Sequence, residues 1–352
     1  MNNRVSARQL CTAGFTGLLS LSAAAAWVDW RGALLAVPPV MLAMYAAVSA
    51  GKRSGGMLRG KAGKPLALIY IIWGVFLTGT ALALCGSRMS AAGGQTEPFW
   101  RTILVSLPVF WLAMGKPEAF ARAAELFYLA MLAVLAFVFL LGAGQVRWPW
   151  LLAGGEDLVR STVTAIGLGC TGVYAVLLWN GGEKGRFLRW TAASGLVLAG
   201  MAAQTVGSLS PALTGTVDRP FFLMTVGLGR TARVEALTAL LWLSADVTLS
   251  GLLAQAVRGL WRDVLELNGE KWVGAGFTAA ALGLALGLEK LGAAERLFRE
   301  IVPLGGLVLG AAVPALLWGC GKLWKSPQTD TISCRSKQDE KKLKKSKKRL
   351  DI

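Results

Sequence analysis

The stretch Arg160-Ser-Thr-Val-Thr-Ala-Ile-Gly-Leu-Gly-Cys-Thr-Gly172 decides which fold this chain is expected to adopt. It lies inside a long apolar run, at about 159–179, yet it carries three glycines and three threonines. Lipid offers no hydrogen bonds, so backbone that leaves helical geometry within a membrane must face protein or a polar cavity. The stretch therefore predicts a membrane-spanning helix that is broken in the protein interior.

A second stretch with the same layout, Arg8-Gln-Leu-Cys-Thr-Ala-Gly-Phe-Thr-Gly17, opens the first apolar run. Matching discontinuous helices in two halves are typical of inverted-repeat transporters, which bind substrate near the membrane midplane. The half-helix N-termini then present free backbone amides to a substrate carboxylate. The alternative interpretation is that these glycines only let neighbouring helices pack closely.

The rest of the chain has the composition of a polytopic membrane protein. It is 54% hydrophobic, with a mean hydropathy of +0.53. A helix needs about 20 mainly apolar residues to cross a bilayer, whereas a β-barrel would show alternating segments of about ten residues. Apolar runs are expected at about 9–28, 33–50, 65–86, 99–115, 119–143, 159–179, 188–209, 234–260, 272–289 and 301–320. We therefore expect an all-α integral membrane protein of about ten transmembrane helices in two halves of five.

Charge indicates the orientation and the domain limits. An even number of spans places both termini on one side, and Lys and Arg gather on that side, so both termini are expected to be cytoplasmic. We expect a transmembrane domain over 1–325, with repeats at about 5–145 and 156–322, and a disordered polybasic tail over 326–352. The tail would bind anionic lipid headgroups or an acidic partner, or only reinforce topology. Nucleic acid is not expected, because no folded basic domain accompanies the tail.

The sequence offers little support for the catalytic sites that are familiar from soluble enzymes. Histidine is absent and the five cysteines are scattered, so familiar hydrolytic sites and metal sites are hard to build. There is also no phosphate-binding loop, dinucleotide fingerprint or nucleophile elbow. We expect neither an enzyme nor a bound metal or cofactor.

Asp246 is the main candidate for chemistry within a span, because charged residues at membrane depth are costly and tend to be functional. Thr238, Trp242 and Ser250 share its helix face at a spacing of four residues. Asp246 could bind a substrate ammonium group or carry a proton. It could also fix helix packing through an interhelical hydrogen bond.

These features predict a substrate pocket between the first, third, sixth and eighth spans. Arg122 and Glu125, three residues apart, are instead expected to form a local ion pair. The predicted substrate-binding residues are Gly14, Thr16, Gly17, Tyr70, Thr78, Gly167, Gly169, Cys170, Thr171, Trp242 and Asp246.

Three segments resemble the B subunits of spore germinant receptors (GerAB-type), a branch of the amino-acid permease superfamily. Val5–Leu10 looks like the Ile-Ser-x-Arg-Gln-Leu start of that family. Gly115–Phe127 resembles its Lys-Gly-x-Glu-x-x-Ala-Arg-x-x-Glu-x-Phe signature, and Arg219–Phe222, followed by Arg233 and Trp242, resembles its pattern before the eighth span.

The resemblance implies the LeuT-like fold of amino-acid permeases, with two inverted five-helix repeats, in the inner membrane of the spore. It also implies A- and C-subunit partners and the sensing of a small nutrient such as an amino acid. The chain departs from the family in its sixth span, where Gly167–Gly172 lacks the usual acidic residue, and in carrying Asp246. The identity of the ligand therefore cannot be carried over from the family to this chain. A proton-coupled amino-acid transporter and a structural subunit that binds nothing stay as alternatives.

Overall fold

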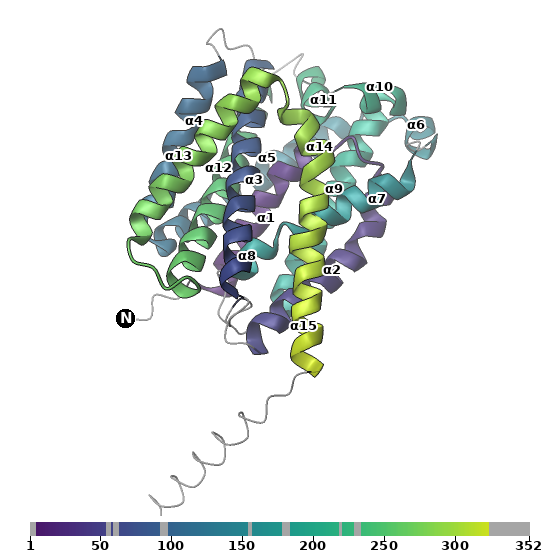
Figure 1. Ribbon diagram of the computed structural model, residues 1–352. Helices are drawn as coiled ribbons and strands as arrows, with labels where there is room; N and C mark the ends of the chain where they lie inside the picture. The colour runs from purple at the N-terminus through teal and green to yellow at the C-terminus, as the bar shows by residue number, and fades with distance from the viewer. Residues whose placement is uncertain are drawn as a thin grey trace, which may run out of the picture.

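The computed structural model describes residues 5–53, 58, 63–91, 98–153, 157–177, 184–217, 220–228 and 234–323. Throughout these ranges the regular secondary structure is helical and no strand occurs, and the helices form one bundle (Figure 1). The predicted basic tail at 326–352 and the motif residues Arg219 and Arg233 lie outside the described residues. The predicted repeat boundaries stay a prediction.

The first five apolar runs coincide with the first five helices. α1 begins where Ser6 and Gln9 form a capping box: the Ser6 hydroxyl accepts from the Gln9 N–H at 3.2 Å, and the Gln9 side chain accepts from the Ser6 N–H at 3.1 Å. α4 and α5 both begin at a proline, which suits the first turn of a helix. The helices are α1 (Ala7–Ala24), α2 (Trp30–Arg53), α3 (Gly63–Ala91), α4 (Pro98–Met114) and α5 (Pro117–Ala143).

The second five runs also coincide with helical spans, two of which are not regular α-helices throughout. The sixth run forms α7 (Leu158–Cys170) and α8 (Val173–Leu177), and the tenth forms α14 (Ala294–Gly305), the π-helix η1 (Gly306–Ala312) and α15 (Val313–Leu323). Between them lie α9 (Lys184–Leu209), α12 (Val234–Asp263) and α13 (Glu270–Leu291). Short helices α6 (Trp148–Ala153), α10 (Pro211–Thr216) and α11 (Pro220–Leu228) connect spans. The prediction of about ten spans is confirmed.

The exterior of the bundle is apolar, as a lipid-facing surface must be. Within the described ranges, six helices are long and apolar enough to cross a membrane by themselves. On α5, Leu126, Leu129 and Leu140 are 69%, 66% and 76% exposed. A soluble protein rarely exposes so much contiguous apolar surface. The N-terminal end of α1 and the C-terminal end of α15 lie at the same end of the bundle (Figure 1).

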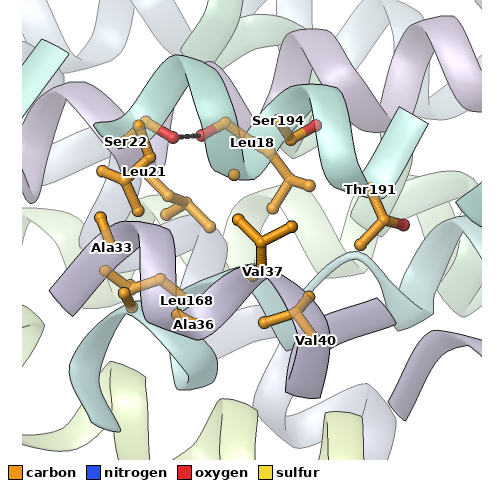
Figure 2. Close-up of a pocket in the computed structure, with 14 residues that line it drawn as sticks. Leu18, Leu21, Ser22, Ala33, Ala36, Val37, Val40, Leu168, Thr191 and Ser194 are labelled. Atoms are coloured by element: carbon orange, nitrogen blue, oxygen red, sulfur yellow. Dashed lines mark hydrogen bonds between the residues drawn. The ribbon is translucent and has the colours of Figure 1, made fainter. Parts of the chain in front are cut away.

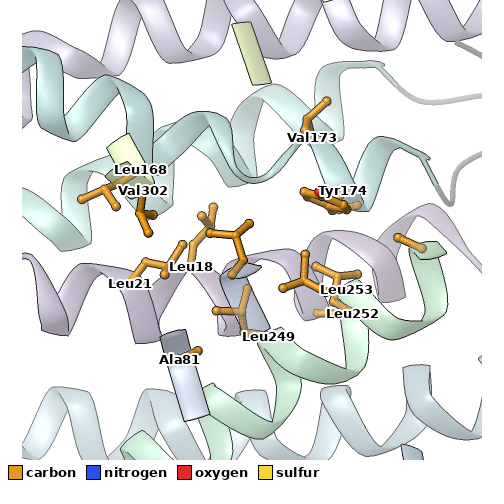
Figure 3. Packing of buried hydrophobic residues seen from close by; sticks show 14 of the residues in the cluster. Leu18, Leu21, Ala81, Leu168, Val173, Tyr174, Leu249, Leu252, Leu253 and Val302 are labelled. Atoms are coloured by element: carbon orange, nitrogen blue, oxygen red, sulfur yellow. The ribbon is translucent and has the colours of Figure 1, made fainter. Parts of the chain in front are cut away.

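α1 forms the centre of the core. Every residue from Leu10 to Ala24 is buried, and the helix packs against α12, α9 and α5. Figure 3 shows Leu249 of α12 close to Leu18 of α1 and Ala81 of α3, so apolar side chains fill the space between these three helices. This packing brings the polar residues of α1 and α12 together in the protein interior.

Arg258 fixes the end of α4 against α12. Its guanidinium, on a residue only 6% exposed, donates to the carbonyls of Ala113 at 2.8 Å and Gly115 at 2.6 Å. Gln255, one turn earlier, donates to the Leu112 carbonyl at 2.7 Å. These groups satisfy carbonyls that have no helical partner at a C-terminus, and a cation is favourable at that end of the helix dipole.

Candidate functional site

The candidate site begins at the interface between α1 and α12. The Ser20 hydroxyl donates a hydrogen bond to the carboxylate of Asp246, which is 0% exposed. A Cβ added to Gly17 would lie 3.1 Å from the Cα of Leu249. Both contacts fit one antiparallel register, which also places Thr16 level with Ser250. The interface therefore carries two polar layers, one turn apart.

Three hydroxyls in this region differ from most Ser and Thr hydroxyls of the spans. Such a hydroxyl usually donates to the carbonyl one turn earlier in its own helix, as Ser22 does to Leu18 at 2.8 Å. Within the described part of the chain, the hydroxyls of Thr16, Thr78 and Ser250 have no hydrogen-bond partner, and all three residues are 0% exposed. Buried polar groups are rarely left unpaired, so this arrangement favours a polar occupant.

Thr78 belongs to the same region through the packing of α3 on α12. A Cβ added to Gly74, one turn before Thr78, would lie 3.3 Å from a methyl group of Val257. Ala81, further along α3, lies close to Leu249 of α12 (Figure 3), so the two helices run antiparallel, with Thr78 level with Leu253 and within one turn of Ser250. The polar cluster, defined as Thr16, Ser20, Thr78, Asp246 and Ser250, is thus contributed by α1, α3 and α12.

The predicted break in the sixth span is confirmed. α7 ends at Cys170, and the N–H groups of Thr171 and Gly172 donate to the carbonyls of Leu168 and Gly169, three residues earlier, at 3.2 Å each. The helix resumes at Val173 as α8. The break lies inside the bundle, as the absence of hydrogen bonds in lipid requires.

The break packs against the π-helix of the tenth span. A Cβ added to Gly306 or Gly310 would overlap the carbonyl oxygen of Gly167 or Cys170, so only glycine permits this approach. The predicted site residues Gly167 and Cys170 therefore serve helix packing here. Gly169, between them, lies against Val40 of α2.

Two tyrosines join the break to the π-helix and α3. The Tyr174 hydroxyl of α8 donates to the Tyr70 carbonyl at 2.7 Å, and the Tyr70 hydroxyl donates to the Leu309 carbonyl at 2.5 Å. In an α-helix the Val313 N–H would donate to the Leu309 carbonyl, but here it donates to the Val308 carbonyl. In a π-helix the donor to the Leu309 carbonyl would be the N–H of residue 314, but Pro314 has no N–H. Tyr70 thus satisfies a carbonyl that the helix itself leaves without a donor.

The predicted break in the first span is wrong. α1 is continuous from Ala7 to Ala24. A Cβ added to Gly14 would lie 3.3 Å from the Cβ of Ala175, and Gly17 has the contact with Leu249 already described. The glycines therefore let α8 and α12 approach α1 closely, which is the packing role that small residues often have in membranes.

The remaining predicted site residues divide between two places. Asp246, Thr16 and Thr78 belong to the polar cluster. Trp242, one turn from Asp246, packs edge-to-face on Phe221 of α11, with ring centroids 5.2 Å apart. The Thr171 hydroxyl donates to the Leu168 carbonyl at 2.6 Å, so it is already used at the break.

The structure contains a cavity on the α2 and α9 side of α1, beside the predicted pocket position. The cavity is walled by α1, α2, α7 and α9 (Figure 2). Among the predicted site residues, Gly169 lines it. The predicted position between the first, third, sixth and eighth spans holds the polar cluster, and Leu249 and neighbouring apolar side chains pack beside it (Figure 3).

Sequence reasoning missed two contacts. Ser20 was not singled out, although its spacing of four residues from Thr16 placed both on one face of α1. The predicted ion pair between Arg122 and Glu125 is wrong, because Glu125 contacts α1 instead. Its carboxylate lies 3.9 Å from the Arg8 Nε and accepts from the Gln9 side chain at 3.3 Å.

No protein-family model matches this chain, and neither does any curated protein sequence. Solved structures do match. One is described as the substrate-bound outward-open state of a Na⁺-coupled sialic acid symporter, with a TM-score of 0.60 and 14% identity, covering 90% of this chain and 79% of that one. Another is MhsT in complex with L-phenylalanine, with a TM-score of 0.55 and 13% identity over 91% and 94% of the two chains.

A third similar structure is the inward-facing conformation of Mhp1, with a TM-score of 0.51 and 15% identity over 86% and 73% of the two chains. Together these likenesses define the class: the chain is an integral membrane protein with the LeuT-like fold of secondary transporters. At this level of identity they show the fold alone, and the resemblance to germinant receptor B subunits stays a prediction.

Proposed function

We propose that this chain is the membrane B subunit of a spore germinant receptor, which binds a small nutrient carrying a cationic group, such as an amino acid, at the polar cluster. The observation that carries the proposal is the fully buried Asp246 carboxylate, bonded to Ser20 and one turn from the layer of Thr16 and Ser250. In this proposal the chain lies in the spore inner membrane, with both termini cytoplasmic, beside A and C subunits.

The chemistry of the cluster selects the ligand class. A carboxylate in a low-dielectric interior is strongly favoured by an adjacent cation, and hydrogen bonds between charged groups are stronger than neutral ones. An ammonium group has three donors, and hydroxyls can accept them. An amino acid would thus place its ammonium near Asp246 and use the hydroxyls of Thr16, Thr78 and Ser250.

Contacts within the family-like segments support the germination part of the proposal. Arg8 and Gln9 come from the first family-like segment and Glu125 from the second, and these three side chains meet in the structure. The pairing gives the two segments a shared role, the attachment of α1 to α5. A chance resemblance of two separate stretches has no reason to produce such a contact.

A secondary transporter is the second candidate, and the fold favours it. One similar structure is a Na⁺-coupled symporter with its substrate bound. In this candidate Asp246 exchanges a proton during transport, since buried acidic residues form proton relays in membrane transporters. The same ligand site would then alternate between the two sides of the membrane.

The purified full chain in proteoliposomes separates these candidates. Labelled amino acids are screened for binding and for uptake under a proton or sodium gradient. Saturable binding without uptake supports a sensor, while gradient-driven uptake overturns it in favour of transport. Binding should be lost in Asp246→Asn and kept in Glu266→Gln, whose side chain is 77% exposed. If no amino acid binds and the A and C subunits still assemble with the chain, it is a structural subunit.

A further inference from the structure

The tenth span contains one residue more than a regular α-helix would need between α14 and α15. From Gly306 to Ala312 it is a π-helix, and the Val313 N–H donates to the Val308 carbonyl, five residues earlier. An α-helix would pair Val313 with Leu309, four residues earlier. A π-turn inside an α-helix is rare and often lies at a functional site. The contacts that hold the π-helix in place therefore merit a functional explanation.

The Tyr70 hydroxyl of α3 favours the π-helix over the α-helix. It donates to the Leu309 carbonyl at 2.5 Å from a residue that is 0% exposed. Without this bond the π-helix would leave that buried carbonyl unsatisfied, because Pro314 has no N–H to offer. An α-helix would satisfy the same carbonyl with the Val313 N–H. The Tyr70 hydroxyl thus decides between two hydrogen-bond registers of one span.

The two registers differ in the position of α15. Rewinding the π-helix into an α-helix would move every residue of α15 forward by one place, a shift of about 1.5 Å and a rotation of about 100°. Leu317 would then take the place of Trp318, which now packs edge-to-face on Tyr45 of α2 with ring centroids 6.0 Å apart. Leu316, which is 67% exposed, would take the place of the half-buried Leu317.

Tyr70 is also attached to the broken sixth span. Tyr174 of α8 donates to the Tyr70 backbone carbonyl at 2.7 Å, and the two rings pack edge-to-face with centroids 5.8 Å apart. Gly310, within the π-helix, lies against the Cys170 carbonyl where α7 ends. A movement of α8 relative to α7 would therefore act on both the Tyr70 donor and the π-helix that it holds.

We propose that the tenth span is a two-register switch. While Tyr70 donates to Leu309 the span keeps the π-helix, and when Tyr70 withdraws it rewinds into an α-helix and rotates α15. The switch carries a movement at the break in the sixth span to the end of the bundle where α1 begins and α15 ends (Figure 1). It does not depend on the polar cluster or on the proposed nutrient, and any ligand that prefers one register shifts it.

Spin labels on α15 of the full chain in lipid vesicles test the switch. Leu316→Cys and Ala315→Cys each carry the label at an exposed position, and Cys320 and Cys334 are replaced by serine. Tyr70→Phe should lower the accessibility of the label at position 316 to dissolved oxygen, because that position moves into a half-buried place. The label at position 315 is the matched control and should stay accessible, because it moves into the exposed place of residue 316. Unchanged accessibility at position 316 would overturn the proposal.

Pro314→Ala separates the switch from a general loosening of α15. This substitution supplies the N–H that can donate to Leu309 in the π-helix, so the Tyr70 hydroxyl is no longer needed. In the Pro314→Ala background, Tyr70→Phe should leave the label at position 316 as accessible as in the wild type. An equal fall with and without Pro314→Ala would overturn the proposal. If Tyr70→Phe alone fails to fold, Pro314→Ala should restore folding, and failure of the double variant would also overturn the proposal.

Discussion

Ser20 and Asp246, 226 residues apart in the chain, are joined by a hydrogen bond at the buried interface of α1 and α12. One turn away, Thr16 and Ser250 occupy the equivalent positions of the next layer, and within the described residues their hydroxyls have no partner. The two layers thus have similar residues and different hydrogen bonding. The Ser20 hydroxyl therefore already makes a structural hydrogen bond, whereas the Thr16 and Ser250 hydroxyls are the ones that a ligand bound at Asp246 could pair with.

Ser20→Ala and Thr16→Val test that difference. Ser20→Ala removes a donor from a buried carboxylate and should lower the free energy of unfolding by about 1–3 kcal/mol. Thr16→Val replaces an unpaired hydroxyl with a methyl group of similar size and should be neutral or stabilising. Unfolding in detergent measures both. An equal loss in the two variants would show that Thr16 also makes a structural hydrogen bond.

Gly310→Ala should strongly destabilise the protein, because its Cβ would overlap the Cys170 carbonyl at the break in the sixth span. The loss should be about 1–3 kcal/mol or more, as for other overpacked sites. Gly283→Ala on α13 is the matched control, since its Cβ would meet nothing within 4 Å. The control should gain up to about 1 kcal/mol of helix propensity. Similar Tm values for the two variants would contradict the close packing of η1 on α7.

Tyr70→Phe should cost more stability than Tyr174→Phe. Tyr70 donates to the Leu309 carbonyl, next to the proline that interrupts backbone bonding, and its loss leaves a buried acceptor unsatisfied at about 1–3 kcal/mol. Tyr174 donates to the Tyr70 carbonyl within the regular helix α3, so its loss should cost about 0.5–1.5 kcal/mol. Unfolding midpoints of the two variants decide this, and the reverse order would contradict the role given to Tyr70.

Arg258→Met should destabilise the junction of α4 and α12. The guanidinium donates to Ala113 and Gly115, and removing these charge-assisted bonds should cost about 1.5–3 kcal/mol. Arg258→Lys keeps the charge but has a different donor geometry, so its stability should lie between those of the wild type and Arg258→Met. Amide hydrogen exchange at the end of α4 should rise in the same order. Unchanged exchange in Arg258→Met would argue against this capping role.

The span positions could be predicted from the sequence because long apolar runs depend only on local composition. The break at Thr171 was predictable for the same reason, since glycine and threonine gather there. The similar stretch around Gly14 shows the limit of that reasoning: glycine permits either a break or a close contact, and the partners Ala175 and Leu249 lie far away in the chain. Only the tertiary packing distinguishes the two.

The candidate site was predictable in part. Asp246 is conspicuous because a charge within a span is costly, and the structure buries it completely. Its partner Ser20 could not be identified, since the register between α1 and α12 depends on packing across the whole bundle. The cavity had no sequence signal at all, because its lining is mostly Ala, Val and Leu, which occur in every span.

The most direct measurement is the equilibrium affinity of the full chain for the amino acid that the screen identifies, compared between the wild type and Asp246→Asn. If the Asp246 carboxylate binds the ligand's cationic group, the substitution should raise Kd by roughly tenfold or more, since a charge-assisted hydrogen bond is worth about 1.5–3 kcal/mol. An unchanged Tm would confirm that the variant is folded. An unchanged Kd in a folded variant would place the nutrient away from Asp246 and contradict the proposed site.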